Sequence, residues 1–573
     1  MIRLTQEEVL QRIKTADRQG HPVELSGMDM RGFSLVNIDL KGANLSHAEL
    51  ANADLRYASL QGANLKGANL QEANICGANL LEADLDGADL QRTRLMDSIL
   101  QKATLRGAKL GRAHLEGAAC EGATFFSAEL MYADFSRARL TNCDLRCSDA
   151  TEAKFGSAIM NGVDAREADF TLAFFKGAVF GRPRLGDAIK LRDAIMRNAK
   201  MHCVDLTDFQ LPGLNCRDAD FTNATLRNAD LSGSDLTTAT LNLADLTGIN
   251  LRGALLTGAN LRNTILSGAD LSEANLNSVN QYQQLSDLAY GVPRASRLML
   301  DGANLHDATL IDAELAGANL TGANLSGADL RNAQVHRATL AHANLRKAKL
   351  QNTQLSYAML QHADLRGAVI GSPVDGSAVA IRFSDLAGAN LSRLDLRLID
   401  LTGVTFYGAL LRGVNLSGVV YGKARFSRAD LTRAELRGAK LNEADMSGAI
   451  LTEADFSGAQ LRKANLRDAF CEPSASKSVC AVMKGADLSQ ANLANARLSK
   501  ADLTGSKLMR AVLHETDLSH SILSEANVRF TDLRRSILTN SKRHKTKTLF
   551  ARMPKKSFGE RLRGILGQQP AGA

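Results

Sequence analysis

A large apolar residue returns every five positions along most of the chain, and a small residue, usually alanine, stands two positions before it. Helices repeat every 3.6 residues and strands every two, so a period of five fits neither element. The small and the large residue share one face of an extended chain, which predicts very short extended pieces that point both side chains inward. Glycine is frequent in the two positions that follow, as a tight turn with positive φ would favour. Within residues 62–90 the large residues are Leu65, Leu70, Ile75, Leu80, Leu85 and Leu90.

Self-similarity at a fixed period points to a repeat architecture before any other interpretation. Tandem units of the form A(D/N)LxG cover about residues 23–540, and they closely resemble the pentapeptide-repeat family. The resemblance implies an all-β fold, a right-handed β-helix of four sides with four units, or twenty residues, in each coil. In that fold the large and the small residue of each unit fill the interior, and the other three positions face solvent.

The large residues keep five registers, which together predict a solenoid of about 24 coils. The registers run over residues 25–180, 191–276, 300–370, 381–466 and 483–538. The interruptions lie near residues 181–188, 277–298, 371–379 and 472–482. The first and the third both begin with Gly-x-Pro and separate two large residues by 11 positions, which predicts a one-residue bulge at a corner of the coil. Three phenylalanines twenty residues apart are expected to stack as a column inside the coils: Phe135, Phe155 and Phe175.

Both ends of the chain differ from the repeats. Residues 1–22 are predicted to form a helix that caps the first coil, with a capping box of Thr5 and Glu8. The formal net charge is +8, and residues 541–573 hold nine Lys/Arg and one acidic residue, which accounts for all of it. We expect this basic tail to contain an amphipathic helix, because apolar residues recur there at helical spacing.

No set of residues suggests catalysis, a cofactor or a metal, so we expect neither an enzyme nor a cofactor-binding protein. The many aspartates that precede the large residues are interpreted as outward structural positions. His342 and His362 are twenty residues apart and should stack, but without a third ligand a solvated pair is favoured over a metal site. Arg346 and Lys347 are typical of a solvated surface.

The eight cysteines fall at mixed repeat positions, which indicates free thiols in a cytosolic protein and not a disulfide framework. Cys471 and Cys480 flank an interruption and could pair under oxidising conditions. No apolar run of about 18 residues predicts a transmembrane helix, and the first residues lack the apolar stretch of a secretory signal. We expect a protein of the bacterial cytoplasm, with delivery by a secretion system without a cleavable signal as an alternative.

Two segments outside the repeats are candidates for interaction. Residues 277–297 show helical spacing and are either a recognition loop or a tolerated insertion. The basic amphipathic helix of the tail is typical of a ligand for a membrane surface or a partner groove, with a disordered solubilising end or a cap over the last coil as alternatives. The candidate residues are Tyr282, Leu285, Leu288, Phe558, Arg561, Leu562, Arg563 and Ile565.

The favoured function is a non-enzymatic scaffold that binds macromolecular partners through flat solenoid faces, the 277–297 loop and the C-terminal tail. One alternative is a DNA-mimicking topoisomerase-protection protein, although that mimicry requires an acidic face and residues 1–540 are neutral overall. Another is an accessory or effector protein of a secretion system, because the opening residues are similar to those of long pentapeptide proteins that accompany type VI secretion.

The expected partners follow from these surfaces. They are other proteins, an anionic membrane surface that contacts the tail, or a second copy of the chain. Nucleic acid is disfavoured as a partner, because the tail offers few aromatic rings on which bases could stack.

Overall fold

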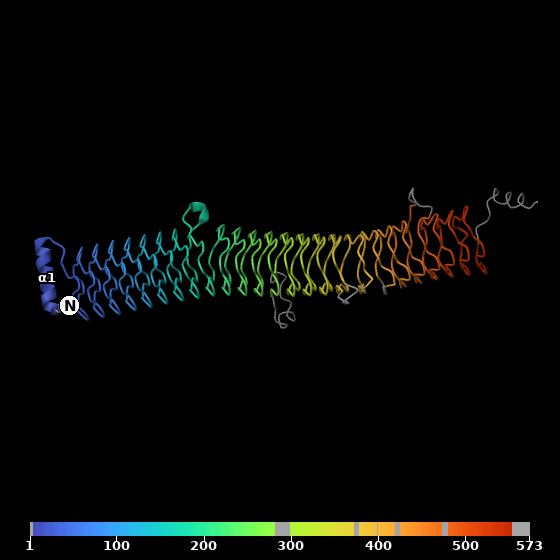
Figure 1. Cartoon of the computed structure of the whole chain (residues 1–573). Helices are drawn as coiled ribbons and strands as arrows, with labels where there is room; N and C mark the ends of the chain where they lie inside the picture. The colour runs from blue at the N-terminus through green and yellow to red at the C-terminus, as the bar shows by residue number, and fades with distance from the viewer. Residues whose placement is uncertain are drawn as a thin grey trace, which may run out of the picture. The chain divides into compact units, whose positions relative to one another are not determined.

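The chain forms stacked coils in two compact units, residues 1–310 and 311–573, and each unit is considered by itself. The computed structural model describes residues 4–280, 298–371, 378–397, 399–418, 424–472 and 479–552. Figure 1 shows the coils lying one on the next within each unit. Apart from α1 (Gln6–Gln19) and the 3-10 turn η1 (Pro183–Leu185), the described residues form no other helix.

The coils pair through single residues and not through long strands. Outside the interruptions the bridges are parallel and join residues twenty apart, such as Asn44 with Asn64 in the first unit and Asn324 with Asn344 in the second. A bridge recurs every five residues, so each coil has four bridge positions separated by four corners. This confirms the expected twenty-residue coil.

One five-residue unit shows why the sequence adopts this geometry, because all five of its backbone N–H groups are bonded. Asn64 donates to a carbonyl of the preceding coil at 2.9 Å, and Leu65 donates to a carbonyl of the following coil at 2.6 Å. Gly67 also donates to the following coil, and Ala68 donates back to Leu65 to close the turn, both at 2.9 Å. The remaining N–H, of Lys66, donates to the Asn64 side chain at 3.1 Å. No backbone N–H group of this unit is therefore left without a hydrogen-bond acceptor.

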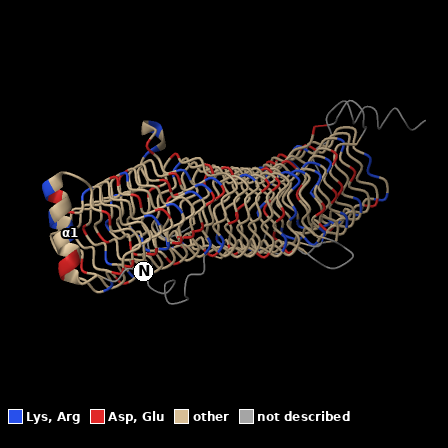
Figure 2. Cartoon of the chain, turned by 60° about the vertical axis from the view of Figure 1, so that its left-hand side comes forward, with Lys and Arg blue, Asp and Glu red and all other residues tan. Residues whose placement is uncertain are grey.

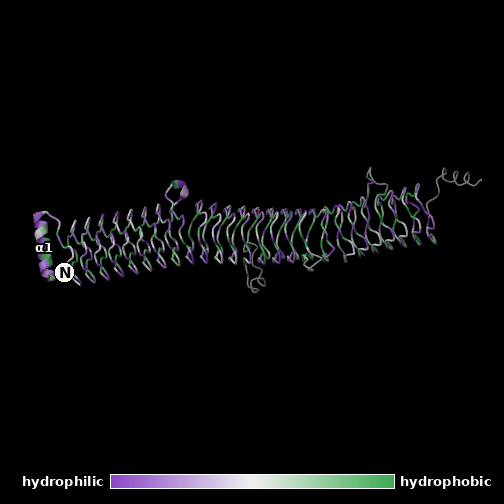
Figure 3. Cartoon of the chain, viewed as in Figure 1, coloured by the Kyte–Doolittle hydropathy of each residue, from purple (hydrophilic) through white to green (hydrophobic). Residues whose placement is uncertain are grey.

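The interior is filled by the small and the large residue of each unit. The leucines at 45, 65, 85 and 105 are fully buried, as are the alanines beside them. Figure 3 shows hydrophobic and hydrophilic positions alternating along the coils. The rings of Phe135 and Phe155 stack at 5.3 Å, and those of Phe155 and Phe175 at 5.1 Å, which confirms the predicted aromatic column.

Helix α1 begins at the predicted capping box, in which the Thr5 side chain accepts from the Glu8 backbone and the Glu8 side chain accepts from Thr5. Its buried residues are Val9 and Ile13. The Gln6 side chain exchanges two hydrogen bonds with the backbone of Ser34, at 3.3 and 3.1 Å, and so attaches the helix to the first coils. No helix in the described ranges is both long and apolar enough to cross a membrane.

The predicted one-residue bulges after Phe180 and Ile370 are wrong. Before the first of them Ile159 pairs with Val179, and after it Asp164 pairs with Lys190, so this coil holds 26 residues instead of twenty. The 11 positions are thus one ordinary five-residue step and a six-residue excursion that leaves the coil and returns. In Figure 1 the first excursion projects from the stack and carries η1.

The other interruptions likewise add residues to one coil, and regular pairing resumes after them. The coil closed by Gln354 and Ala380 also holds 26 residues, the coil closed by Asp455 and Val482 holds 27, and the coil closed by Ile265 and Met299 holds 34. Regular pairing reaches Asn280, so the interruption predicted from 277 begins after that residue.

The predicted end of the solenoid at residue 540 is also wrong, because bridges continue through Lys542, Lys547 and Arg552. The positions that hold leucine elsewhere are here Arg543 and Thr548, and both are exposed. No described coil lies beyond residues 541–552. Their backbone can therefore pair with the preceding coil although positions 543 and 548 hold no apolar residue. That is why the hydrophobic pattern stops one coil before the structure does.

Candidate functional site

The predicted interaction residues lie outside the described part of the chain. Those of the first segment fall within residues 281–297 and those of the tail within residues 553–573. They remain predictions: Tyr282, Leu285, Leu288, Phe558, Arg561, Leu562, Arg563 and Ile565. The surfaces that the structure does describe are therefore considered residue by residue.

The outward carboxylates have a structural role. In eight places an aspartate at a bridge position is joined to the arginine two residues later, with N···O distances of 2.6 to 2.8 Å. The same aspartate commonly accepts from the backbone N–H of that arginine, as Asp329 does from Arg331. Burial would raise the pKa of Asp329, but hydrogen bonds from Arg331 and then Lys349 outweigh it and hold the pKa below its usual value. These aspartates fix turns and pair charges, which gives a physical reason for the structural role that the sequence interpretation assigned to them.

The two stacked histidines form a pair at one corner of the second unit. The rings of His342 and His362 lie 5.0 Å apart and nearly parallel. The next coil has Gly388 at this corner, where a Cβ would meet the His362 ring. Among the described residues no group of three or more His, Cys, Asp or Glu side chains could hold a metal ion.

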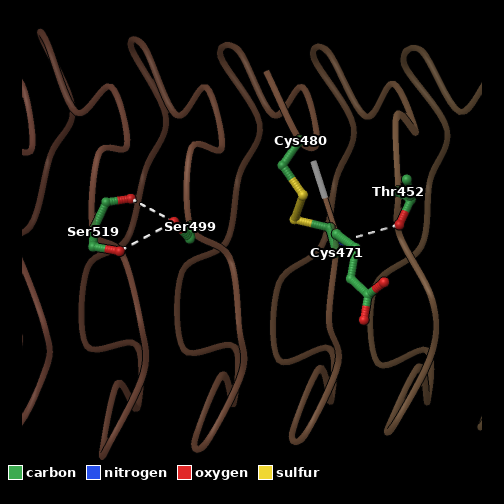
Figure 4. Close-up of a disulfide and its surroundings, with 6 residues drawn as sticks. Thr452, Cys471, Cys480, Ser499 and Ser519 are labelled. Atoms are coloured by element: carbon green, nitrogen blue, oxygen red, sulfur yellow. Dashed lines mark hydrogen bonds between the residues drawn. A yellow bond between two sulfur atoms is a disulfide. The ribbon is translucent and has the colours of Figure 1, made fainter. Parts of the chain in front are cut away.

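A disulfide joins Cys471 and Cys480 at the base of the fourth excursion (Figure 4). Both cysteines are buried, and the backbone of the neighbouring Glu472 donates to the Thr452 hydroxyl at 3.0 Å. Of the two possibilities left open for this pair, the structure shows the disulfide and not two free thiols. The other six are free, and Cys147 and Cys203 are exposed among them.

Sequence analysis missed a basic groove on the second unit. Its volume is about 880 Å³, and its cationic lining residues are Arg346, Lys347, Arg366, Arg393, Arg412 and Arg433. Arg346 and Lys347 were interpreted only as solvated surface, because the sequence does not show which residues stack beside them. Arg393 occupies the same corner column as Lys347 because the third excursion adds six residues to the coil between them. The sequence alone does not show this equivalence. Both signs of charge are interspersed over the coils, as Figure 2 shows.

Two further exposed features are pairs of aromatic rings. Tyr357 stacks on Phe383 at 5.2 Å, and Phe530 stacks on Phe550 at 5.3 Å. All four side chains are at least half exposed. They follow from the repeat, because equivalent corner positions of successive coils lie side by side.

The comparisons with known proteins identify the repeat. The family described as Pentapeptide repeats (8 copies) matches residues 34–71, 63–101, 103–142, 143–182, 199–237, 215–253, 244–280, 300–334, 336–370, 382–418, 423–468, 481–510 and 510–540. No curated protein sequence matches the chain.

Three solved structures are similar to parts of the chain. HetL, a pentapeptide repeat protein involved in heterocyst differentiation regulation from the cyanobacterium Nostoc sp., is 28% identical over 47% of this chain and 87% of its own, with a TM-score of 0.16. A pentapeptide repeat protein of the Arabidopsis thaliana thylakoid lumen is 26% identical over 22% of this chain and 74% of its own, with a TM-score of 0.12. Full-length QnrB1, a plasmid-mediated fluoroquinolone resistance protein, is 16% identical over 50% of this chain and 92% of its own, with a TM-score of 0.14.

The family match covers more than half of the chain, and its members form right-handed β-helices of the kind built by the twenty-residue bridges described above. The chain belongs to the pentapeptide-repeat family.

Proposed function

We propose that the chain is a non-enzymatic scaffold whose coils present surfaces to macromolecular partners. The supporting observation is the filled interior. The cavity among the core leucines of the second unit, between Leu350 and Leu396, measures only about 10 Å³, too little to hold a small substrate. We therefore place binding on the outside of the coils, where equivalent side-chain positions of successive regular coils lie side by side.

The coils, the 277–297 loop and the C-terminal tail are the three proposed contact regions. A pull-down from native lysate with the full chain and with a chain that ends at Arg552 separates the tail from the rest. Ending at Arg552 keeps the last bridged coil intact, which an end at residue 540 would remove. Proteins lost with the tail assign targeting to the tail. Proteins retained assign it to the coils or the loop, and capture of no specific protein by either chain contradicts the scaffold function.

The proposed amphipathic helix of the tail has its own test. Leu562→Asp with Ile565→Asp puts two charges on its apolar face and should abolish any binding that depends on the tail. Gly564→Asp with Gly567→Asp is the matched control, since it adds the same charge on the side of the predicted helix opposite that face. Equal loss in both double variants would indicate a charge effect, and equal binding to the unmodified chain would contradict the helix.

The topoisomerase-protection alternative has less support. A DNA-mimicking surface requires unpaired acidic groups, whereas eight bridge-position aspartates of the described coils are each paired with an arginine. Delivery by a secretion system is a separate proposal. It is tested by comparing the amount of the chain in the culture medium of a secreting strain and of a secretion-deficient strain.

A further inference from the structure

The basic groove gathers cations from five successive coils of the second unit. Arg346, Arg366 and Arg412 occupy the first corner position after one column of bridges, and Lys347, Arg393 and Arg433 occupy the second. Successive coils are about 4.8 Å apart, so these six cations extend over roughly 19 Å. They line one hollow of about 880 Å³ together with Asn390, Ser392, Thr432 and the exposed side chain of Leu410.

Only half of this charge is neutralised by neighbours. Arg366 pairs with Asp364 at 2.6 Å, Arg412 pairs with Asp430, and Arg433 pairs with Glu453 at 3.1 Å. The hydrogen bond from Arg366 holds the pKa of Asp364 below its usual value, and the charge of Arg346 adds to that effect. Within the described residues the structure shows no ion pair for the remaining three: Arg346, Lys347 and Arg393.

Glycines give the groove its shape. The second corner position alternates between a long cation and glycine, in the order Lys347, Gly367, Arg393, Gly413 and Arg433. A Cβ at Gly367 would lie 3.7 Å from Cγ of Lys347, and a Cβ at Gly413 would lie 3.7 Å from Cγ of Arg393. The stems of the cations thus lie over the neighbouring glycines, and their charged ends are held in one hollow.

The lining residues distinguish among anionic partners. Guanidinium groups bind carboxylates and phosphates in a fixed fork geometry. An acidic protein segment would also need apolar or aromatic anchors for affinity, and Leu410 is the only exposed apolar side chain among the lining residues. A phosphate backbone needs no such anchor, because its affinity comes from charge neutralisation and counterion release. No aromatic ring lines the groove, so bases would not stack there.

We propose that the basic groove binds the phosphate backbone of a nucleic acid, without reading its sequence. The proposal differs from the expectation that nucleic acid is disfavoured, which rested on the tail and not on the coils. It names a partner class for one surface of the proposed scaffold and so rests on that function. The pull-down of proteins tests the scaffold separately, so the two can fail independently.

The test uses the full chain and fluorescence anisotropy with labelled oligonucleotides of ~20 nucleotides, single-stranded and double-stranded, at about 50 mM salt. The groove variant is Arg346→Glu with Lys347→Glu and Arg393→Glu. The control variant is Arg337→Glu with Lys440→Glu and Arg462→Glu, three exposed cations of the same unit that do not line the groove. Both variants change the charge equally, and glutamate already occupies the positive-φ corner position at Glu443 and Glu453.

We expect the groove variant to bind the oligonucleotide at least about tenfold more weakly and the control variant to lose less than about threefold in affinity. The reason is that losing three phosphate contacts lowers the affinity far more than the general change in charge does. The plot of log affinity against log salt should become shallower by about 2 in the groove variant with the single strand, since each lost contact contributes about 0.7. Thermal melting by circular dichroism verifies that both variants remain folded.

Three results would overturn the proposal. The first is no binding by the unmodified chain at low salt. The second is equal affinity of the groove and control variants, which would place binding elsewhere, such as the basic last coil. The third is that polyglutamate displaces the oligonucleotide as effectively as inorganic polyphosphate does. That result would indicate an acidic protein as the partner.

Discussion

At the scale of single residues, the Asp or Asn of each unit accounts for much of the fold. Four of the five N–H groups of a unit find backbone carbonyls, and the fifth is bonded by this side chain, as in Asn64 with Lys66. The following corner residue has positive φ whether it is glycine, as at Gly67, or not, as at Glu82. A non-glycine residue there is strained by about 1–2 kcal/mol. The hydrogen bond from Glu82 N–H to the Gln101 carbonyl of the next coil offsets part of that strain.

Asp329→Asn separates the charge of an aspartate from its hydrogen bond, because asparagine can still accept from the corner N–H. Asp329 has a lowered pKa, so its charge stabilises the fold above the pKa of an unfolded aspartate, about 4, and that stabilisation is lost as the pH falls through the lower folded value. We expect Asp329→Asn to lower the free energy of unfolding by the order of 1 kcal/mol at pH 7, because the carboxylate bonds two cations. The difference should shrink as the pH falls below about 4 and disappear once the carboxyl group is protonated in the folded chain as well.

Denaturant unfolding from pH 7 to pH 2 measures this difference. Asp312→Asn is the control, because Asp312 is an exposed corner residue with no ion pair shown in the described part of the chain. A destabilisation by Asp329→Asn that is the same at every pH would contradict an electrostatic origin.

At the scale of elements, excursions leave the coil without disturbing the pairing on either side. Gly181 and Gly186 bound the first excursion, both with positive φ, and Asp187 accepts from the Arg182 N–H at 2.8 Å. Arg184 pairs with Asp208 at 2.6 Å and attaches the excursion to a neighbouring coil. Such closed loops add length to a coil at little cost, since loop closure depends weakly on loop length.

Gly181→Ala and Gly186→Ala form a matched pair within this excursion. Both would place a side chain at positive φ, but a Cβ at Gly181 would overlap the backbone of Asp187, whereas a Cβ at Gly186 meets nothing within 4 Å. We expect Gly186→Ala to cost about 1–2 kcal/mol, from the positive φ alone, and Gly181→Ala to cost clearly more. Limited proteolysis should detect faster cleavage near residues 181–188 in Gly181→Ala alone. Equal cleavage of both variants would show that the excursion is not held as described.

The disulfide at the fourth excursion determines how many free thiols the chain should have. Titration of thiols in denaturant, after purification without reductant, should find six in the unmodified chain, because six of the eight cysteines are free. Cys471→Ser removes one cysteine and releases Cys480, so the count should rise to seven. Eight thiols in the unmodified chain would contradict the disulfide.

At the scale of the whole molecule, each coil contacts only its neighbours, so stability is a sum over coils and interfaces between coils. A defect in one coil should therefore have local effects. The N-terminal end is covered by α1, whereas the last described coil, residues 541–552, leaves its interior positions exposed.

Leu325→Asp tests this locality in the second unit. Leu325 is fully buried, so the substitution removes a core side chain and buries a charge, at a cost of about 3 kcal/mol or more. Hydrogen exchange followed by mass spectrometry should show lost protection around residues 320–350 and unchanged protection around residues 500–530. Arg337→Asp, at an exposed corner, should leave both regions protected. Loss of protection throughout the second unit would indicate that it unfolds as one cooperative body.

The period of five determined most of the fold from sequence alone. Small and large residues at fixed spacing, with Asp or Asn between them, specify a local chain path that repeats every twenty residues, and each coil needs only its neighbours to complete it. The column of phenylalanines, the stacked histidines and the capping box of α1 follow from that regularity, and all three are present.

The tertiary structure alone decided how the coils align across each interruption. A spacing of 11 is compatible with two steps and a bulge or with one step and a six-residue excursion, and only the partner across the coil distinguishes them. That alignment brings Arg393 into the same corner column as Lys347 and so forms the basic groove, and the return of an excursion to its starting point brings Cys471 to Cys480. The physical reason is that the repeat is encoded locally, residue by residue, whereas the register after an excursion is fixed by hydrogen bonds to a different coil.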